Sequence, residues 1–398
     1  MTRMLRPGGT PPVGQAKRAL VSFEVCAREP HLHDAIRKAF KDEDLAHLFV
    51  FATPKVDFAG FMRELAETFS CTVSGCTSAG EIGRSGYVTD HVVLVGLPRR
   101  YFAAKTVLIE DLTGADLRLV VDTLIRDRIA LRSANPDKRS GFSFLMVDGM
   151  SKREDALVNA ITPGLAGFPL FGGSAGDSLR FSSAFVSLGG EVYENAATVT
   201  FVATNCETRV FSINHMKPTP TRMVVTEADP PRRIVKKINA EPAAEEYARL
   251  IGKDPMQLDE LIFAGHPIIV RLGDEYHVRA IQRVTKEGHL EFFSAIDEGM
   301  VLTLAYAEDM VEKLDHDLAE IVNGHDTTDI LACDCVLRRI EAERSQKHHL
   351  VNQVLQKHNI AGFSTYGEQI GTLHVNHTMT GVAIFPPPAN GAGNGRTA

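Results

Sequence analysis

Short apolar runs rich in β-branched and aromatic residues alternate with amphipathic segments along the first half of the chain. Between these runs, apolar residues recur at helical spacing in the segments 31–42 and 58–70. The runs have the length and composition of buried strands, and they cover residues 19–25, 47–53, 91–97 and 142–148. Alternation of this kind predicts a sheet with helices packed on it.

Further strands are expected at 183–188 and 198–204, before a proline-rich change of composition at 217–242. Strand-like runs inside that segment indicate an ordered crossing. Beyond it, the pattern predicts a helix at about 242–251, strands near 267–271, 276–283 and 289–293, helices at about 305–322 and 336–357, and strands near 359–364 and 381–385. We therefore predict an α/β to α+β protein of two domains, with mixed sheets flanked by helices and a ligand cleft between or beside them.

Composition narrows the class of protein. The chain has 398 residues and a formal net charge of −7, and no basic run suggests nucleic-acid binding. No apolar run approaches the ~20 residues of a membrane span, and the first residues lack the apolar core of a signal peptide. The six cysteines are irregularly spaced, which argues against a disulfide framework and favours a cytoplasmic protein.

A small-residue turn followed by a glutamate occurs twice, as GCTSAGEIG at 75–83 and GFSTYGEQIG at 362–371. A shorter relative, FGGSAGD, occupies 171–177. For one copy alone, a tight turn after a buried strand is the simpler interpretation. Three copies favour a shared cleft, with glycines that allow close backbone approach and hydroxyl groups that bond the backbone or a ligand. The candidate ligand-binding residues are Gly80, Glu81, Ser364, Thr365, Tyr366, Gly367 and Glu368. We also expect positive φ at the two glycines that precede the glutamates.

Five segments in order, SGCTSAGEIG, PLFGGSAGD, YHVRAI, CDCVLRR and GFSTYGEQIGTLHVNHT, resemble the FIST family over roughly 45–385. The resemblance implies a FIST N-terminal region at 19–230 and a FIST C-terminal region at 231–386, with disordered ends at 1–18 and 387–398. It implies a cytoplasmic ligand-binding sensor of signal transduction whose partner is a histidine kinase or a cyclic-di-GMP enzyme. A homodimer is compatible with this expectation.

A stand-alone subgroup of the family binds haem and senses nitric oxide, and this chain shows no kinase segment of its own. Haem iron needs an axial His, Cys, Met or Tyr, and the absence of a Cys-x-x-Cys-His motif leaves haem b. His266, His277 and His374 have the most apolar neighbours, and His266 and His277 are preferred as iron ligands. Arg279 is a candidate partner for ligand carboxylates, and the resemblance implies a pocket or structural role for Cys335. A hydrogen-bonded core or surface role is the alternative for each histidine.

Three alternatives stay open at this point. The first is a sensor for a small amino-acid-like ligand held by arginine and hydroxyl groups. The second is an enzyme that pairs carboxylates among Glu81, Glu368, Asp148 and Asp177, although no nucleophile–base pair or metal-hydrolase motif supports it, so we expect no enzyme. The third is a zinc or iron–sulfur site built from Cys71, Cys76, Cys333 and Cys335, which requires the two halves of the chain to meet. Isolated buried thiols are the simpler interpretation of these cysteines.

Overall fold

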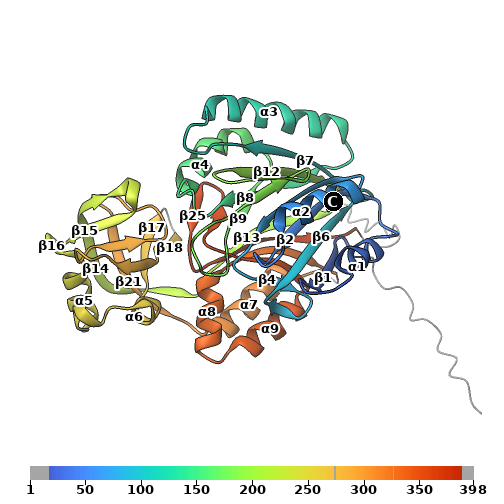
Figure 1. Cartoon of the computed structure of the whole chain (residues 1–398). Helices are drawn as coiled ribbons and strands as arrows, with labels where there is room; N and C mark the ends of the chain where they lie inside the picture. Colours follow the sequence, from blue (N-terminus) through green and yellow to red (C-terminus); the bar gives the residue numbers. More distant parts are fainter. Residues whose placement is uncertain (1–17, 273–274, 326, 388–398) are drawn as a thin grey trace, which may run out of the picture.

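The computed structural model describes residues 18–272, 275–325 and 327–387. The expected disordered ends lie outside the described residues, apart from one residue at the inner edge of each. The described chain forms a mixed α/β structure with four sheets flanked by helices, as the sequence pattern predicts. Three sheets mix parallel and antiparallel pairs, and the fourth is antiparallel. Three six-stranded sheets make up a large body, and the fourth sheet forms a smaller unit beside it (Figure 1).

Each sheet of the body is built around a parallel pair of strands joined by helix. In the first sheet these elements are β2 (Leu45–Ala52), α2 (Phe58–Thr68) and β3 (Thr72–Thr77). In the second they are β8 (Ser140–Asp148), α4 (Glu154–Ile161) with the short 3-10 helix η1 (Thr162–Leu165), and β9 (Leu170–Ala175). In the third they are β22 (Asp329–Cys335), α8 (Val336–Arg344), α9 (His348–Lys357) and β23 (Ile360–Thr365).

Two antiparallel strands extend each sheet on the side of its first parallel strand. They are β6 (His91–Pro98) and β1 (Val21–Cys26) in the first sheet, β12 (Ala197–Thr204) and β7 (Phe102–Ile109) in the second, and β26 (Met379–Phe385) and β13 (Glu207–Ile213) in the third. The central strands are buried on both faces, which explains their near-continuous apolar sequences.

Each sheet is completed by a hairpin that follows a strand of another sheet, so the three sheets are joined in a closed ring. The hairpins are β4 (Glu81–Gly83) with β5 (Gly86–Val88), β10 (Val186–Leu188) with β11 (Glu191–Tyr193), and β24 (Glu368–Ile370) with β25 (Leu373–Val375). β4 follows β3 but pairs with β23; β24 follows β23 but pairs with β9; β10 follows β9 but pairs with β3. The repeated turn is therefore the point at which the chain leaves one sheet and crosses to the next.

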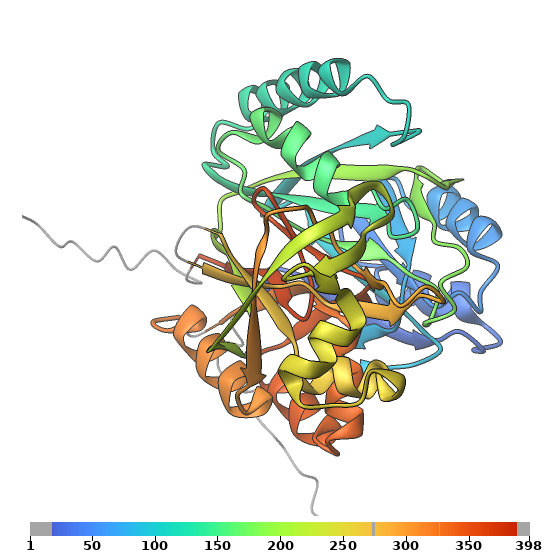
Figure 2. The same cartoon turned by 90° about the vertical axis from the view of Figure 1, so that its left-hand side faces the viewer.

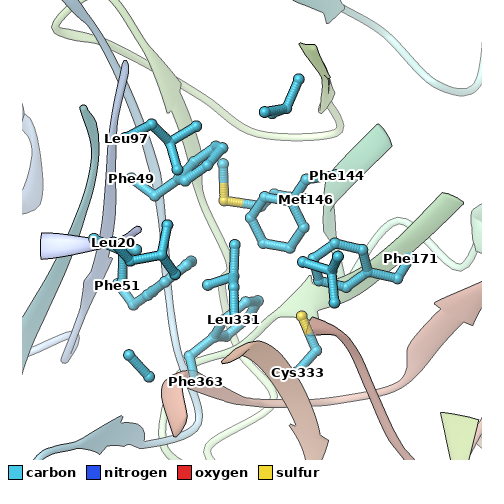
Figure 3. Packing of buried hydrophobic residues seen from close by; sticks show 14 of the residues in the cluster. Leu20, Phe49, Phe51, Leu97, Phe144, Met146, Phe171, Leu331, Cys333 and Phe363 are labelled. Atoms are coloured by element: carbon cyan, nitrogen blue, oxygen red, sulfur yellow. The ribbon is translucent and has the colours of Figure 1, made fainter. Parts of the chain in front are cut away.

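A shared aromatic core fills the centre of this ring. Figure 3 shows Phe49 and Phe51 of β2, Phe144 of β8, Phe171 of β9 and Phe363 of β23 converging in it. The rings of Phe51 and Phe363 stack with their centroids 4.6 Å apart, and those of Phe144 and Phe171 stack at 4.9 Å. Because all three sheets supply these side chains, the body has one central core rather than one core for each half of the sequence.

Helices cover the outer faces of the three sheets. α1 (Leu32–Ala39) and α2 pack on the first sheet, α3 (Leu117–Ala134) and α4 on the second, and α7 (Met310–Val322), α8 and α9 on the third. Aspartates begin three of these helices: the side chains of Asp57, Asp116 and Asp309 accept hydrogen bonds from backbone N–H groups of the first turn. Such caps satisfy donors that the helix itself leaves without partners.

Residues 216–307 form the inserted unit, which the chain enters after β13 and leaves before α7. Figure 2 views the molecule from the side of this unit. Its sheet runs in the order β18–β17–β21–β14–β15–β20–β19, with β16 paired to β15. The elements are β14 (Met216–Asp229), η2 (Pro230–Arg232), β15 (Ile234–Ile238), β16 (Glu241–Pro242), α5 (Ala243–Ile251), η3 (Pro255–Gln257), α6 (Glu260–Gly265), β17 (Ile268–Leu272), β18 (Glu275–Val278), β19 (Ile281–Val284), β20 (Leu290–Phe292) and β21 (Val301–Ala307).

Several element boundaries differ from the sequence prediction. The segment 336–357 forms two helices, because the chain bends at 345–347, where Gln346 has a φ of +57°. The segment 305–322 begins as the end of β21, and its helix starts only at Met310, after the Asp309 cap. The segment 276–283 divides into β18 and β19, which lie at opposite ends of the inserted sheet. The chain passes from the body into the inserted unit at 214–215 and returns to the body at 308–309. The predicted division of the family regions at 230/231 stays a prediction.

Candidate ligand-binding site

The three similar turns meet inside the body. Short backbone hydrogen bonds of 2.7–3.2 Å connect each turn to the other two. These bonds join Ala79 and Gly80 to Ser364, Tyr366 and Gly367 to Ser174, and Gly176 to Thr77. The turns therefore close the ring of sheets by binding one another.

The hydroxyl groups of the two long turns bond the glutamates of the same turns. Ser78 Oγ donates to Glu81 Oε1 at 2.6 Å, and Thr365 Oγ1 donates to Glu368. Both carboxyl groups are fully buried, and burial raises the pKa of Glu81 to about 7 and that of Glu368 well above its usual range. These contacts give the turns a structural role, and direct contact of these residues with a ligand stays a prediction.

Only one of the two glycines before the glutamates has the expected backbone. Gly80 has a φ of +142°, whereas Gly367 lies outside the positive-φ region. Gly367 is small for a different reason, because a Cβ atom there would overlap Nε2 of His374. A Cβ atom on Gly80 would overlap the guanidinium of Arg339. A side chain at either position would have to displace Arg339 or His374, and at position 80 it would also have to adopt a backbone conformation that favours glycine.

Glu81→Gln is expected to flatten the dependence of stability on pH. The Glu81 carboxyl titrates near 4.5 when unfolded and near 7 when folded, so the folded state binds its proton more tightly. The contribution of this carboxyl group to stability is therefore largest below pH 4.5, and about 3 kcal/mol of it is lost as the pH rises to 7. Urea unfolding between pH 5 and pH 8 measures the effect. An equally steep loss in Glu81→Gln would show that another group carries it.

A cavity of about 640 Å³ lies between the body and the inserted unit. The inserted unit lines it with Phe263, His266, Val278, Ala280, Ile281, Arg283 and Phe293, and the body lines it with Arg180, Phe181, Leu337, Ile340, Arg344 and His377. Its volume and its mixture of apolar walls with a few charged groups are typical of small-molecule sites.

His266 is the predicted iron ligand that lies in this cavity. It follows α6, and its Nδ1 atom lies 3.0 Å from the carbonyl oxygen of Ile262. Since a carbonyl only accepts, Nδ1 carries the proton and Nε2 keeps a lone pair. The carbonyl of His266 in turn accepts a hydrogen bond of 2.7 Å from the hydroxyl of Tyr247. This support resembles the second contact that orients metal-binding histidines.

The other predicted cofactor residues lie outside the set that lines the cavity. His277 is buried in β18 directly before Val278, whose side chain lines the cavity from the other face of the strand. His374 is buried, and its Nδ1 atom lies 3.1 Å from Oδ2 of Asp155. Arg279 is also buried and donates to the carbonyl of His374 at 2.8 Å. Cys335 is a buried thiol before α8, and burial raises its pKa well above the usual range.

A strained loop connects the turns to the cavity. Ser178, Leu179 and Phe181 have φ values of 60°, 71° and 50°, which non-glycine residues rarely adopt. The Asp177 carboxylate holds this loop by accepting from the backbone N–H of Phe181 at 2.8 Å and from the Tyr366 hydroxyl. The rings of Phe181 and Tyr366 stack with their centroids 4.4 Å apart. Tyr366 therefore links the turn at 362–371 to Phe181, whose side chain lines the cavity.

Buried charged groups hold the inserted unit against the body. Arg233 Nη2 lies 2.6 Å from Oε2 of Glu154 and 3.6 Å from Oδ2 of Asp155. Oδ2 of Asp155 also accepts from the backbone N–H of Ala295 at 3.1 Å. We call this contact, formed by Arg233 and Ala295 of the inserted unit with Glu154 and Asp155 of the body, the seam. Arg233 also donates to the carbonyl oxygen of Phe293, a residue of the cavity wall, so the seam holds one side of the cavity in place.

The remaining sequence candidates have local partners. The Asp148 carboxylate accepts from the backbone N–H groups of Met150 and Asn195, so it braces the end of β8. Cys76 and Cys333 meet in the central core, where burial raises the pKa of both thiols. Among the described residues, the groups of side chains with metal-binding geometry contain no cysteine.

Sequence reasoning missed most of the charged groups of the cavity. Arg180, Arg283, Arg344 and His377 lie on four separate segments, and their neighbours in sequence give no common motif. The sequence neighbours of His377, Asn376 and Thr378, are polar and favour a hydrogen-bonded role for it. Only the packing of the inserted unit against the body brings these four side chains to one cavity.

Comparison with known proteins identifies both halves of the chain. A FIST N domain matches residues 46–241, and a FIST C domain matches residues 243–371. No curated protein matches the chain. None of the described helices has the length and apolar character needed to cross a membrane. With the two domains covering most of its length, the chain belongs to the FIST-domain proteins, whose domains are sensory domains of signal transduction.

Proposed function

We propose that this protein is a haem-based nitric oxide sensor that holds haem b in the cavity between the body and the inserted unit. The observation that carries the proposal is the position of His266 and the hydrogen bond of its ring. His266 lines the cavity beside apolar side chains and has one ring nitrogen bonded to a carbonyl, which leaves the other for iron. Bound haem supplies a ferrous iron that takes up nitric oxide.

The other residues of the cavity suit the rest of the haem group. Phe181, Phe263 and Phe293 offer apolar and aromatic surface to a flat macrocycle. Arg180 and Arg283 come from opposite walls and carry guanidinium groups, which suit carboxylates such as the haem propionates. The donor set and the walls therefore fit haem b.

The position of the cavity suggests how occupancy changes the surface of the protein. A ligand held by both walls favours the arrangement in which the inserted unit and the body are close, because only that arrangement offers both sets of contacts. Phe181 and the turn residue Tyr366 pass the contact on to the centre of the body. A histidine kinase or a cyclic-di-GMP enzyme would read the resulting change at the surface.

The direct test is a haem titration of the purified chain followed by its Soret absorbance. Wild type is expected to bind one haem per chain, and the reduced form is expected to change its spectrum with nitric oxide. His266→Ala should lose at least tenfold in affinity, whereas His316→Ala, at an exposed position on α7, should bind normally. Wild-type spectra and affinity in His266→Ala would contradict the assignment of the axial ligand.

One observation supports the second candidate, a sensor for a small amino-acid-like ligand. Four buried residues at the seam have side-chain atoms without a hydrogen-bond partner: Arg279, Ser294, His374 and Asn376. These unpaired atoms include donors, such as Nε of Arg279, and acceptors, such as Oδ1 of Asn376, and together with Asp155 they suit the carboxylate and ammonium groups of an amino acid. If the wild type takes up no haem, a thermal-shift screen of amino acids should show a ligand whose stabilisation is reduced by Ser294→Ala. If no amino acid in the screen stabilises the protein, this candidate is excluded.

A further inference from the structure

Three side chains from distant parts of the body converge beside the cavity: His215, Glu341 and His377. His215 follows β13, Glu341 lies in α8, and His377 follows β25. The Nε2 atom of His215 lies 3.0 Å from both carboxylate oxygens of Glu341, and Nε2 of His377 lies 2.9 Å from Oε2. The metal-binding atoms of these three residues all lie within 4.8 Å of one another.

Two imidazole nitrogens and one carboxylate oxygen are a donor set for divalent transition metals, and zinc sites with an open position use it. In a tetrahedral site with bonds of about 2.0–2.1 Å, the ligand atoms are about 3.3 Å apart. The nitrogen–oxygen distances of 2.9–3.0 Å in this trio are shorter by a few tenths of an ångström. Small side-chain movements would therefore make room for an ion.

The trio can be reached from outside. His377 lines the cavity together with Leu337 and Ile340 of α8, and the Glu341 side chain is 22% exposed. His377 also has a φ of +55°, a backbone conformation that is strained for a non-glycine residue and that occurs often at functional sites. An ion held here would have ligands from three segments and a coordination position open to solvent or to a small molecule.

We propose that His215, Glu341 and His377 bind one divalent transition-metal ion, with zinc as the reference ion. The inference rests on these three residues alone and does not depend on the ligand of the cavity. His266 and the trio are separate sites, so either can fail without the other.

Arg338 places a condition on binding. Its Nη1 atom donates to Nδ1 of His215 at 2.9 Å, and its Nε atom donates to Asp334 at 2.8 Å. The His215 ring therefore carries its proton on Nε2 and donates it to Glu341 when no ion is bound. An ion on Nε2 requires this proton to move to Nδ1, so the contact with Arg338 has to open. Binding is thus coupled to a movement of Arg338 in α8, the helix that lines the cavity.

The test uses the full chain without haem. Co²⁺ is titrated while its visible d–d absorption is recorded, and Zn²⁺ is measured by equilibrium dialysis. Wild type is expected to bind one ion per chain with a four- or five-coordinate Co²⁺ spectrum. His377→Ala and Glu341→Gln should weaken binding at least tenfold. His316→Ala is the matched control, because it disrupts an exposed group of the same kind, formed by His316, Asp317 and Glu320.

His377→Cys separates loss of a ligand from loss of folding, because it replaces the imidazole by another metal-binding group. It should retain binding and shift the Co²⁺ spectrum towards that of a thiolate ligand. The proposal is overturned if wild type binds no ion. It is also overturned if folded His377→Ala and Glu341→Gln bind the ion with wild-type affinity.

Discussion

Arg233→Met is expected to destabilise the protein by about 3–5 kcal/mol and to loosen the inserted unit from the body. The Arg233 side chain is 6% exposed and that of its partner Glu154 is 3% exposed, with 2.6 Å between Nη2 and Oε2. Methionine fills much of the same space, but it leaves the Glu154 carboxylate buried without its cation. Urea unfolding measures the loss, and limited proteolysis around residues 214–216 and 307–309 reports on the attachment of the unit.

A matched control exists within the inserted unit. Arg283 also forms an ion pair, with Glu291 at 2.7 Å, but its side chain is 68% exposed. Solvent screens such a pair, so Arg283→Met should change the free energy of unfolding by less than about 1 kcal/mol. Addition of Glu154→Gln to Arg233→Met should recover part of the lost stability, because the double variant leaves no unpaired charge. Equal effects at Arg233 and Arg283 would contradict the role given to the seam.

Phe363→Ala is expected to cost about 3–5 kcal/mol, since it removes a fully buried ring from the central core. The ring stacks on Phe51, and strand β23 pairs with β22 on one side and, on the other, with β4 of the hairpin that follows the turn at 75–83. Because the three sheets share this core, the body should still unfold in one transition. Leu119→Ala on α3, where the side chain is 65% exposed, should have little effect. Separate transitions for the two halves of the sequence would argue against one common core.

The sequence predicted those elements that local pattern controls. The apolar runs of β2, β6 and β8 and the helical spacing of α2 are properties of single segments, and the structure confirms these elements and the α/β class. The repeated turn was also visible as a repeat. Its consequence, the exchange of hairpins around a ring, depends on pairings between residues almost 300 positions apart, such as Phe363 with Glu81. No local pattern specifies such a pairing.

The same limit applies to the site. His266 could be proposed as a ligand from its apolar neighbours, because these are properties of one segment, and this role stays a prediction. The contact of His215 with Glu341 and His377 could not be predicted from the sequence. These residues lie in or directly after α8, β13 and β25, which are far apart in the sequence and share no motif. The hydroxyl groups of the turns illustrate the opposite case. Their spacing suggested a lining for a cleft, and the structure shows them bonded to their own glutamates.

The central claim is that haem binds in the cavity between the inserted unit and the body, and a side chain that fills this cavity tests the claim most directly. Ala280 lines the cavity at the junction of β18 and β19, so Ala280→Trp places a large side chain in the space proposed for haem. The measurement is the haem affinity of the purified variant, from its Soret titration, beside that of Leu119→Trp at the exposed site on α3. We predict that Ala280→Trp lowers the affinity at least tenfold and that Leu119→Trp leaves it unchanged. Haem binding of wild-type affinity and spectrum in a folded Ala280→Trp variant would contradict the proposed site.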